Sequence, residues 1–146
     1  MTLMLQKEVA KRLVAEPSTK DYGILSVLAQ AFFGTSYMFD VSPMCFKPPP
    51  KVISGVVRLK VKASPLIGAE KEEFFKKVVK TSFGKRRKTL FNCLKAFGLR
   101  DEELRKILLD CDIDPKRRGE TLGLAEFRAL TDALTKEGCS VDLNQE

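Results

Sequence analysis

The sequence predicts an α/β fold that is followed by a small all-helical domain. Strand-like alternation of apolar and polar residues occurs only before about residue 62, and later segments repeat apolar residues with helical spacing alone. Between the two patterns, Ala63-Ser64-Pro65-Leu66-Ile67-Gly68 has the composition of a linker. We therefore expect an α/β portion in residues 1–64, a helical domain in residues 65–137, and a polar tail in residues 138–146 that frays.

The α/β portion is expected to contain two helices between its first and second strands. Met1–Leu5 is an apolar run typical of a buried strand, and Lys7–Ala15 follows it with one apolar helical face. Asp21 is the expected N-cap of the second helix, and Gly34 is its expected stop.

Two alternating segments, Tyr37–Val41 and Val57–Lys62, predict the remaining strands. The first strand, Met1–Leu5, is apolar throughout and needs neighbours on both faces, which three strands and two helices do not supply. The sequence therefore predicts that the α/β portion is incomplete and that one edge of its sheet lacks a partner.

Between the second and third strands lies the segment Phe46-Lys47-Pro48-Pro49-Pro50-Lys51-Val52. Each proline restricts φ to about −65° and biases the preceding residue toward extended geometry, so we expect a stiff arm from Lys47 to Pro50 that presents Phe46. From composition alone, Phe46 suits stacking on a ligand and packing in the core equally well. Recognition by a proline-binding domain is a weaker alternative, since strands flank the prolines closely.

The helical domain is expected to contain a first helix through Phe74–Val79, which ends at Gly84, and a second from Lys85 to Phe97. Asp101 is expected to cap a third helix, and Asp114-Pro115 to start another. The last expected helix runs from Gly123 to Leu134. Apolar residues on one face of each helix predict a common core.

Cations gather at the start of the expected Lys85–Phe97 helix, as Lys85, Arg86, Arg87 and Lys88. Cations at a helix N-terminus oppose the macrodipole, so we interpret them as a phosphate site, which helix N–H groups would complete. Arg117 and Arg118 strengthen this interpretation, and a solvated basic face is the alternative. The chain has 26 Lys and Arg against 19 Asp and Glu, and the net charge of +7 favours a polyanionic partner.

Several function classes are excluded by what the sequence lacks. No apolar stretch approaches about 18 residues and no signal-peptide pattern is found, so we expect a cytoplasmic protein without a membrane partner. There is no histidine, and the four cysteines are scattered, so no metal site is expected. Without a Gly-rich phosphate loop or paired carboxylates, a self-contained hydrolase or kinase is not expected.

Several segments, in order, resemble those of the dimethyladenosine transferases of the small ribosomal subunit, which are S-adenosylmethionine-dependent RNA methyltransferases. They are Gln6-Lys7-Glu8-Val9-Ala10-Lys11-Arg12-Leu13, Tyr22-Gly23 with Leu25-Ser26-Val27, Phe46–Val52, Arg86-Arg87-Lys88-Thr89-Leu90, and Ile113-Asp114-Pro115 with Arg118 and Glu120. The resemblance covers nearly the whole chain. It departs at Ile53, where the family usually has an aspartate.

The resemblance implies a fold and a set of roles. The fold is the C-terminal part of a Rossmann-like methyltransferase sheet, followed by a helical domain that binds ribosomal RNA. Phe46 would stack on a flipped target adenine, and Lys85, Arg86, Arg87, Lys88 and Arg118 would hold RNA phosphates. The implied activity is N6,N6-dimethylation of two adjacent adenines near the 3′ end of small-subunit rRNA, in a pre-30S-like particle.

The same resemblance implies that the S-adenosylmethionine site is missing from this chain. The family's Gly-rich cofactor loop, its acidic ribose and adenine ligands, and its Asn-Leu-Pro-Tyr motif do not occur in the sequence. We therefore expect the chain to be inactive alone and to bind no cofactor. The alternatives are a non-catalytic rRNA-binding module and one half of a split methyltransferase whose N-terminal half is separate.

Overall fold

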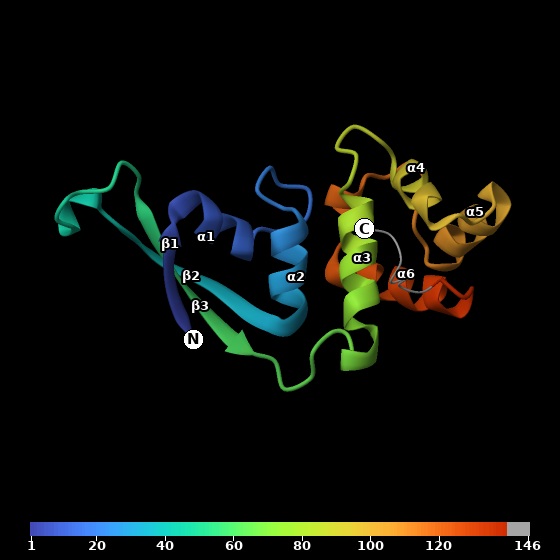
Figure 1. Cartoon of the computed structure of the whole chain (residues 1–146), viewed down its shortest axis with the longest axis horizontal. Helices are drawn as coiled ribbons and strands as arrows, with labels where there is room; N and C mark the ends of the chain where they lie inside the picture. Colours follow the sequence, from blue (N-terminus) through green and yellow to red (C-terminus); the bar gives the residue numbers. More distant parts are fainter. Residues whose placement is uncertain (140–146) are drawn as a thin grey trace. The chain divides into compact units, whose positions relative to one another are not determined.

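The computed structural model describes residues 1–139 of the chain. These residues form two compact units, which meet between Pro65 and Leu66 in the sequence (Figure 1). Residues 140–146, which hold most of the expected polar tail, lie outside the described part. None of the helices in residues 1–139 is long and apolar enough to cross a membrane.

The first unit is a three-stranded antiparallel sheet with two helices. Its elements are β1 (Thr2–Gln6), α1 (Lys7–Val14), α2 (Ile24–Phe32), β2 (Phe33–Val41), the short 3-10 turn η1 (Pro43–Cys45), and β3 (Ser54–Val61). The strand order is β1-β3-β2, so β3 pairs with both neighbours. Within residues 1–139 no strand pairs with the outer edge of β1.

Helices α1 and α2 contribute to the core on one face of this sheet. Ala10 and Leu13 of α1 pack with Val57 of β3, and Leu3 and Tyr37 join them from the outer strands. Side chains on the other face of β1 are exposed, as at Met4, which is 52% exposed. The apolar run of β1 is thus covered on one face within the described chain.

The expected boundaries of the second helix are wrong. Gly23, not Asp21, is the N-cap of α2, and its N–H donates to Ser26 Oγ at 3.1 Å. The helix ends at Phe32, and Phe33 adopts extended backbone at once, so no glycine stop is needed and Gly34 lies inside β2.

Strand β2 is longer and less regular than its alternation predicts. Its pairing with β3 shifts between Tyr37 and Phe39, which leaves Met38 as an extra residue. After the shift Phe39 is 57% exposed.

The second unit contains only helices and short turns. They are η2 (Ala69–Lys71), α3 (Glu72–Ser82), α4 (Leu90–Leu94), η3 (Lys95–Phe97), α5 (Asp101–Asp110), η4 (Gly119–Thr121) and α6 (Leu124–Lys136). The largest fully buried side chains come from all four α-helices, including Phe75, Leu90, Leu104 and Phe127. The predicted order of an α/β portion followed by helices is confirmed.

The expected helix from Lys85 to Phe97 is much shorter in the structure. Helix α4 begins at Leu90, and Thr89 is its N-cap, with the Thr89 Oγ1 accepting a hydrogen bond from the Asn92 N–H at 3.3 Å. A threonine hydroxyl satisfies the first free N–H groups of a helix better than the lysine before it can. Lys85 to Lys88 therefore belong to the loop between α3 and α4.

Two other helix starts also differ from expectation. Asp101 is the first residue of α5 and the cap is Arg100, whose N–H donates to Glu103 Oε2 at 3.2 Å. No helix starts at Asp114-Pro115, because Asp114 closes a turn: its carbonyl accepts from the Arg117 N–H at 3.0 Å. The start of α6 at Gly123 is confirmed.

Candidate functional site

The loop from Lys85 to Lys88 carries four exposed cations. Within the described chain, none of the four side chains has an acidic partner within 4.0 Å, in contrast to Lys71, Lys76 and Arg117 elsewhere in the same unit. The loop is closed by a hydrogen bond from the Lys88 N–H to the Lys85 carbonyl at 3.0 Å. The expectation that these cations lie in the first turn of a helix is wrong, so the macrodipole argument for phosphate binding does not apply to them.

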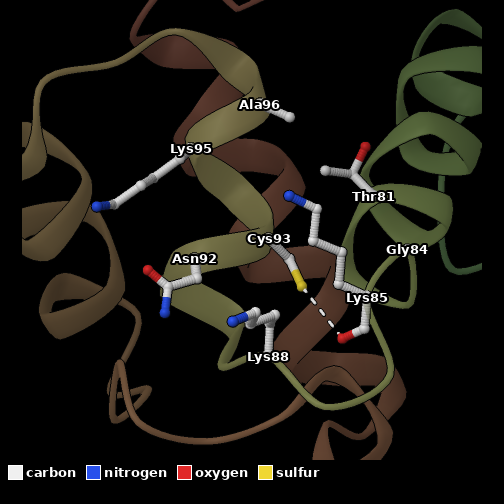
Figure 2. Close-up of a pocket in the computed structure, with 8 residues that line it drawn as sticks. All are labelled: Thr81, Gly84, Lys85, Lys88, Asn92, Cys93, Lys95 and Ala96. Carbon is white, nitrogen blue, oxygen red and sulfur yellow. Dashed lines mark hydrogen bonds between the residues drawn. The ribbon is translucent and has the colours of Figure 1, made fainter.

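The loop instead borders a pocket of about 690 Å³ at the end of α3 and along α4 (Figure 2). The pocket is lined by Thr81, Gly84, Lys85, Lys88, Asn92, Cys93, Lys95 and Ala96. Arg86 and Arg87 do not line it. Lys85, Lys88, Asn92 and Lys95 thus lie around one pocket, although only the last part of this segment is helical.

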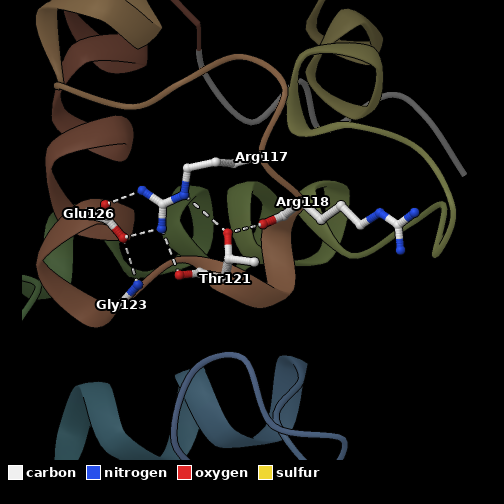
Figure 3. A network of polar contacts seen from close by, with 5 residues as sticks. All are labelled: Arg117, Arg118, Thr121, Gly123 and Glu126. Carbon is white, nitrogen blue, oxygen red and sulfur yellow. Dashed lines mark hydrogen bonds and ion pairs between the residues drawn. The ribbon is translucent and has the colours of Figure 1, made fainter.

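Arg117 has a structural role that the sequence did not reveal. Its guanidinium makes two hydrogen bonds to the Glu126 carboxylate, at 2.5 and 3.1 Å, and two more to Thr121 (Figure 3). Glu126 also accepts the N–H of Gly123 at 2.9 Å, which caps α6. The hydrogen bond from Arg117 holds the pKa of Glu126 below its ordinary value, and Arg117 is unavailable as a free cation.

Arg118 is exposed, and its side chain extends away from the Arg117 network (Figure 3). The carbonyl of Arg117 accepts a hydrogen bond from the Leu90 N–H at 2.6 Å, which joins the Arg118 segment to the end of the cationic loop. The only ion pair of Arg118 among the described residues is a 4.0 Å contact with Glu120. The structure thus brings Arg118 beside the loop of Lys85 to Lys88, and we call these five residues the basic site.

Phe46 lies in the long loop between β2 and β3 and is half-buried. Its N–H donates to the carbonyl of Pro43 at 3.2 Å. The chain bends at residues 46–48. The expectation of one extended arm from Lys47 to Pro50 is therefore wrong, and Phe46 is presented by a bent loop.

A polar network at the base of this loop escaped the sequence analysis. Lys7 Nζ lies 2.6 Å from Asp40 Oδ2, and the Tyr37 hydroxyl donates a short hydrogen bond to the other carboxylate oxygen. The hydrogen bond from Lys7, followed by that from Tyr37, lowers the pKa of Asp40. The hydrogen bond to Asp40 raises the pKa of Tyr37 to about 12. No spacing rule relates Lys7 to Asp40, because their contact depends on how α1 crosses the sheet.

The junction of β1 and α1 lacks the kind of turn that binds a nucleotide cofactor. Close approach of backbone to such a group needs a glycine-containing turn between a strand and a helix. At the junction of β1 and α1, Gln6 leads directly into Lys7, and the residues there are all side-chain bearing. Nor does any group of three or more Cys, Asp or Glu side chains in residues 1–139 suit a metal ion.

Comparison with known proteins decides the family. The model of the family described as ribosomal RNA adenine dimethylase matches residues 1–130. The chain belongs to this dimethylase family. Curated relatives include Ribosomal RNA small subunit methyltransferase A of Clostridium perfringens, which is 48% identical over 93% of this chain and 48% of its own length. The protein of the same name from Geobacter sulfurreducens is 48% identical over 97% of this chain and 52% of its own length.

Solved structures confirm the predicted fold class. A dimethyladenosine transferase from Plasmodium falciparum superimposes with a TM-score of 0.81 at 23% identity, over 94% of this chain and 57% of that one. The 23S rRNA methyltransferase ErmE gives a TM-score of 0.63 at 23% identity, over 92% and 54%. This dimethylase-family chain therefore has part of a methyltransferase α/β fold with a helical unit, and it spans about half the length of the curated relatives it matches.

Proposed function

We propose that this chain is the RNA-binding and target-holding part of an S-adenosylmethionine-dependent rRNA adenine N6,N6-dimethyltransferase. Its substrate would be two adjacent adenines near the 3′ end of small-subunit rRNA, in a pre-30S-like particle in the cytoplasm. The observation that carries the proposal is a match to the ribosomal RNA adenine dimethylase family over residues 1–130. The basic site supplies the exposed cations that an RNA ligand requires. Among residues 1–139, the one ion pair that these cations make is the 4.0 Å contact of Arg118 with Glu120.

The basic site would hold RNA phosphates. Lysine and arginine side chains that contact phosphates fix the register of a nucleic acid without reading its sequence. Lys85, Arg86, Arg87 and Lys88 lie on one closed loop, and the Arg117–Leu90 hydrogen bond keeps Arg118 beside it. Cations held on a closed loop lose less freedom when they bind than cations on an open chain would.

Phe46 would stack on the target adenine after that base leaves its helix. A base must be unstacked before its exocyclic amine can react, and an aromatic ring compensates the lost stacking by about 1–3 kcal/mol. Phe46 is half-buried, so part of its ring surface is accessible to a base. Lys7 anchors the loop that carries it, through Asp40 at one end and the Ile53 carbonyl at the other.

S-adenosylmethionine would supply the methyl group in the complete enzyme. Since the junction of β1 and α1 lacks a glycine-containing turn for this cofactor, we propose that the chain alone neither binds it nor catalyses methyl transfer. Isothermal calorimetry with S-adenosylmethionine tests this, and saturable binding by the isolated chain would contradict it.

Binding of small-subunit rRNA fragments at several salt concentrations tests the RNA role. We expect the double variant Arg86→Ala/Arg87→Ala to flatten the salt dependence, with the slope of log K against log salt falling by about 0.7–0.9 for each lost phosphate contact. Lys106→Ala, which removes an exposed cation from α5, is the control for net charge. An unchanged slope in the double variant, or an equal change in the control, would leave the loop as a solvated basic face.

A second candidate is one half of a split methyltransferase. The outer edge of β1, with which no strand of residues 1–139 pairs, favours it. An exposed strand edge presents N–H and C=O groups that another strand can pair with. Co-expression with a separate piece that carries the family's cofactor motifs, followed by co-purification and a methylation assay, tests this candidate. Failure of the two pieces to associate at micromolar concentrations would contradict it.

A further inference from the structure

The pocket bordered by the loop of Lys85 to Lys88 is preformed, because hydrogen bonds hold the segments that line it. The Lys85 carbonyl lies 3.8 Å from Cys93 Sγ of α4, which ties the loop to the helix (Figure 2). Thr89 caps α4 one turn before Asn92 reaches the pocket, and Lys88 closes the loop onto Lys85. Its volume of about 690 Å³ lies within the range of about 300–1,000 Å³ that is typical of small-ligand sites.

The pocket is positively charged, and Lys85 and Lys88 supply the amines that are free to bind an anion. Lys95 also lines the pocket, but its ammonium group lies 4.9 Å from the Phe91 ring centre and 3.5 Å from an Asp101 oxygen. Figure 2 shows the Lys95 side chain extending away from Lys85, whereas the Lys85 side chain extends beside Cys93. The described residues that line the pocket include no carboxylate to neutralise these amines.

Asn92 gives the pocket a neutral group of a different kind. Its side chain is exposed at the pocket and makes no hydrogen bond within residues 1–139, since the capping bond to Thr89 uses its backbone N–H. A side-chain amide offers two donors and an acceptor, which match a hydroxyl that both donates and accepts. No aromatic side chain lines the pocket, so it offers no surface on which a base could stack.

We propose that this pocket binds one phosphate and the adjoining ribose of an RNA strand. Lys85 and Lys88 contact the phosphate, and the Asn92 amide contacts the ribose 2′-hydroxyl. This assignment rests on the proposed RNA-binding function and deepens it, because Asn92 becomes the residue that distinguishes RNA from DNA at this site. The 2′-hydroxyl is the group by which a protein makes that distinction.

The test compares the binding of an oligouridylate dodecamer with that of its deoxyuridylate counterpart, which differs only in the 2′-hydroxyls, by the full chain and its variants. We expect Asn92→Ala to lower the ratio of RNA to DNA affinity about fivefold, the size of one hydrogen bond, and to leave the salt slope unchanged. Lys85→Ala/Lys88→Ala should instead lower both affinities and reduce the salt slope by about 0.7. Alanine suits a helix and the Thr89 cap does not use the Asn92 side chain, so thermal melting of Asn92→Ala should match that of the parent chain.

The outcomes separate this inference from the function on which it rests. If the parent chain binds RNA but Asn92→Ala keeps the same RNA to DNA ratio, the assignment of Asn92 is overturned and the RNA-binding function stands. If the parent chain binds neither oligonucleotide nor rRNA fragments, the proposed function itself fails. An RNA preference lost in Arg86→Ala/Arg87→Ala but kept in Asn92→Ala would place 2′-hydroxyl recognition outside the pocket and also overturn the inference.

Discussion

The ammonium group of Lys7 lies 2.6 Å from Oδ2 of Asp40 and joins the first residue of α1 to the end of β2. The backbone N–H of the same lysine donates to the Ile53 carbonyl at 2.9 Å, just before β3 begins. One residue therefore holds both ends of the loop that carries Phe46. The position of Phe46 depends on these end contacts as well as on the prolines between them.

We predict that Lys7→Met loosens this loop without unfolding the first unit. The variant keeps the backbone contact to Ile53 but loses the ion pair to Asp40, and such exposed pairs add little to global stability. Hydrogen exchange followed by mass spectrometry should therefore show faster exchange in residues 44–47, with little change in melting temperature. Lys11→Met on the same helix is the matched control, and equal exchange in both variants would contradict a specific role for Lys7.

The same network makes a prediction about Tyr37. The hydrogen bond to Asp40 is the largest cause that raises its pKa to about 12. Because this pKa is higher in the folded chain than the ordinary value of 10.0, the network stabilises the fold fully below pH 10.0. That stabilisation is lost as the pH rises toward 12. We expect Asp40→Asn to return the pKa of Tyr37 toward 10, because an amide lacks the charge that opposes the phenolate. NMR titration of the ring carbon bonded to the hydroxyl measures this pKa for each tyrosine separately. A pKa that stays near 12 in the variant would show that Asp40 is not the cause.

The order of elements was predictable from sequence because hydrophobic periodicity is a local property. The alternation at Val57–Lys62 and the helical spacing at Phe74–Val79 both correspond to real elements, β3 and α3. Element ends were less predictable, since they depend on which side chain reaches a free N–H. Thr89, rather than one of the lysines before it, caps the first free N–H groups of α4, so the helix begins at Leu90 and is shorter than expected.

Residue types in the candidate site were predictable, but their partners were not. Arg117 and Arg118 are identical neighbours in sequence, yet one is bound to Glu126 and the other is exposed. The difference arises because the turn closed by Asp114 directs Arg117 toward Glu126 in the first turn of α6, nine residues further along the chain. A single sequence contains no signal for that contact.

We predict that Glu126→Gln destabilises the helical unit by about 1–2 kcal/mol at neutral pH, because charged hydrogen bonds to Arg117 and the cap at Gly123 are both weakened. The pKa of Glu126 is lowered in the folded chain, so its contribution is present above the ordinary value of 4.5 and is lost as the pH falls through the lowered value. Urea unfolding at neutral and acidic pH measures both effects. Glu120→Gln is the control and should change stability little, because it removes only a 4.0 Å contact. If the free energies of unfolding of Glu126→Gln and the parent chain still differ by as much in acid, the proposed linkage to the pKa of Glu126 is wrong.

Gly119 determines how closely the Arg118 segment can approach α3, and this gives a last prediction. A Cβ added at Gly119 would clash with the Ser82 carbonyl oxygen, which is backbone and cannot turn away. We expect Gly119→Ala to destabilise the helical unit by about 1–3 kcal/mol, the usual cost of overpacking, and to weaken RNA binding by displacing Arg118. Gly34→Ala is the control, since its Cβ would meet neighbours no closer than 3.8 Å. Urea unfolding and RNA titration of both variants would measure the two effects. Full stability in Gly119→Ala would show that the segment can move away from Ser82, and the basic site would then not depend on this contact.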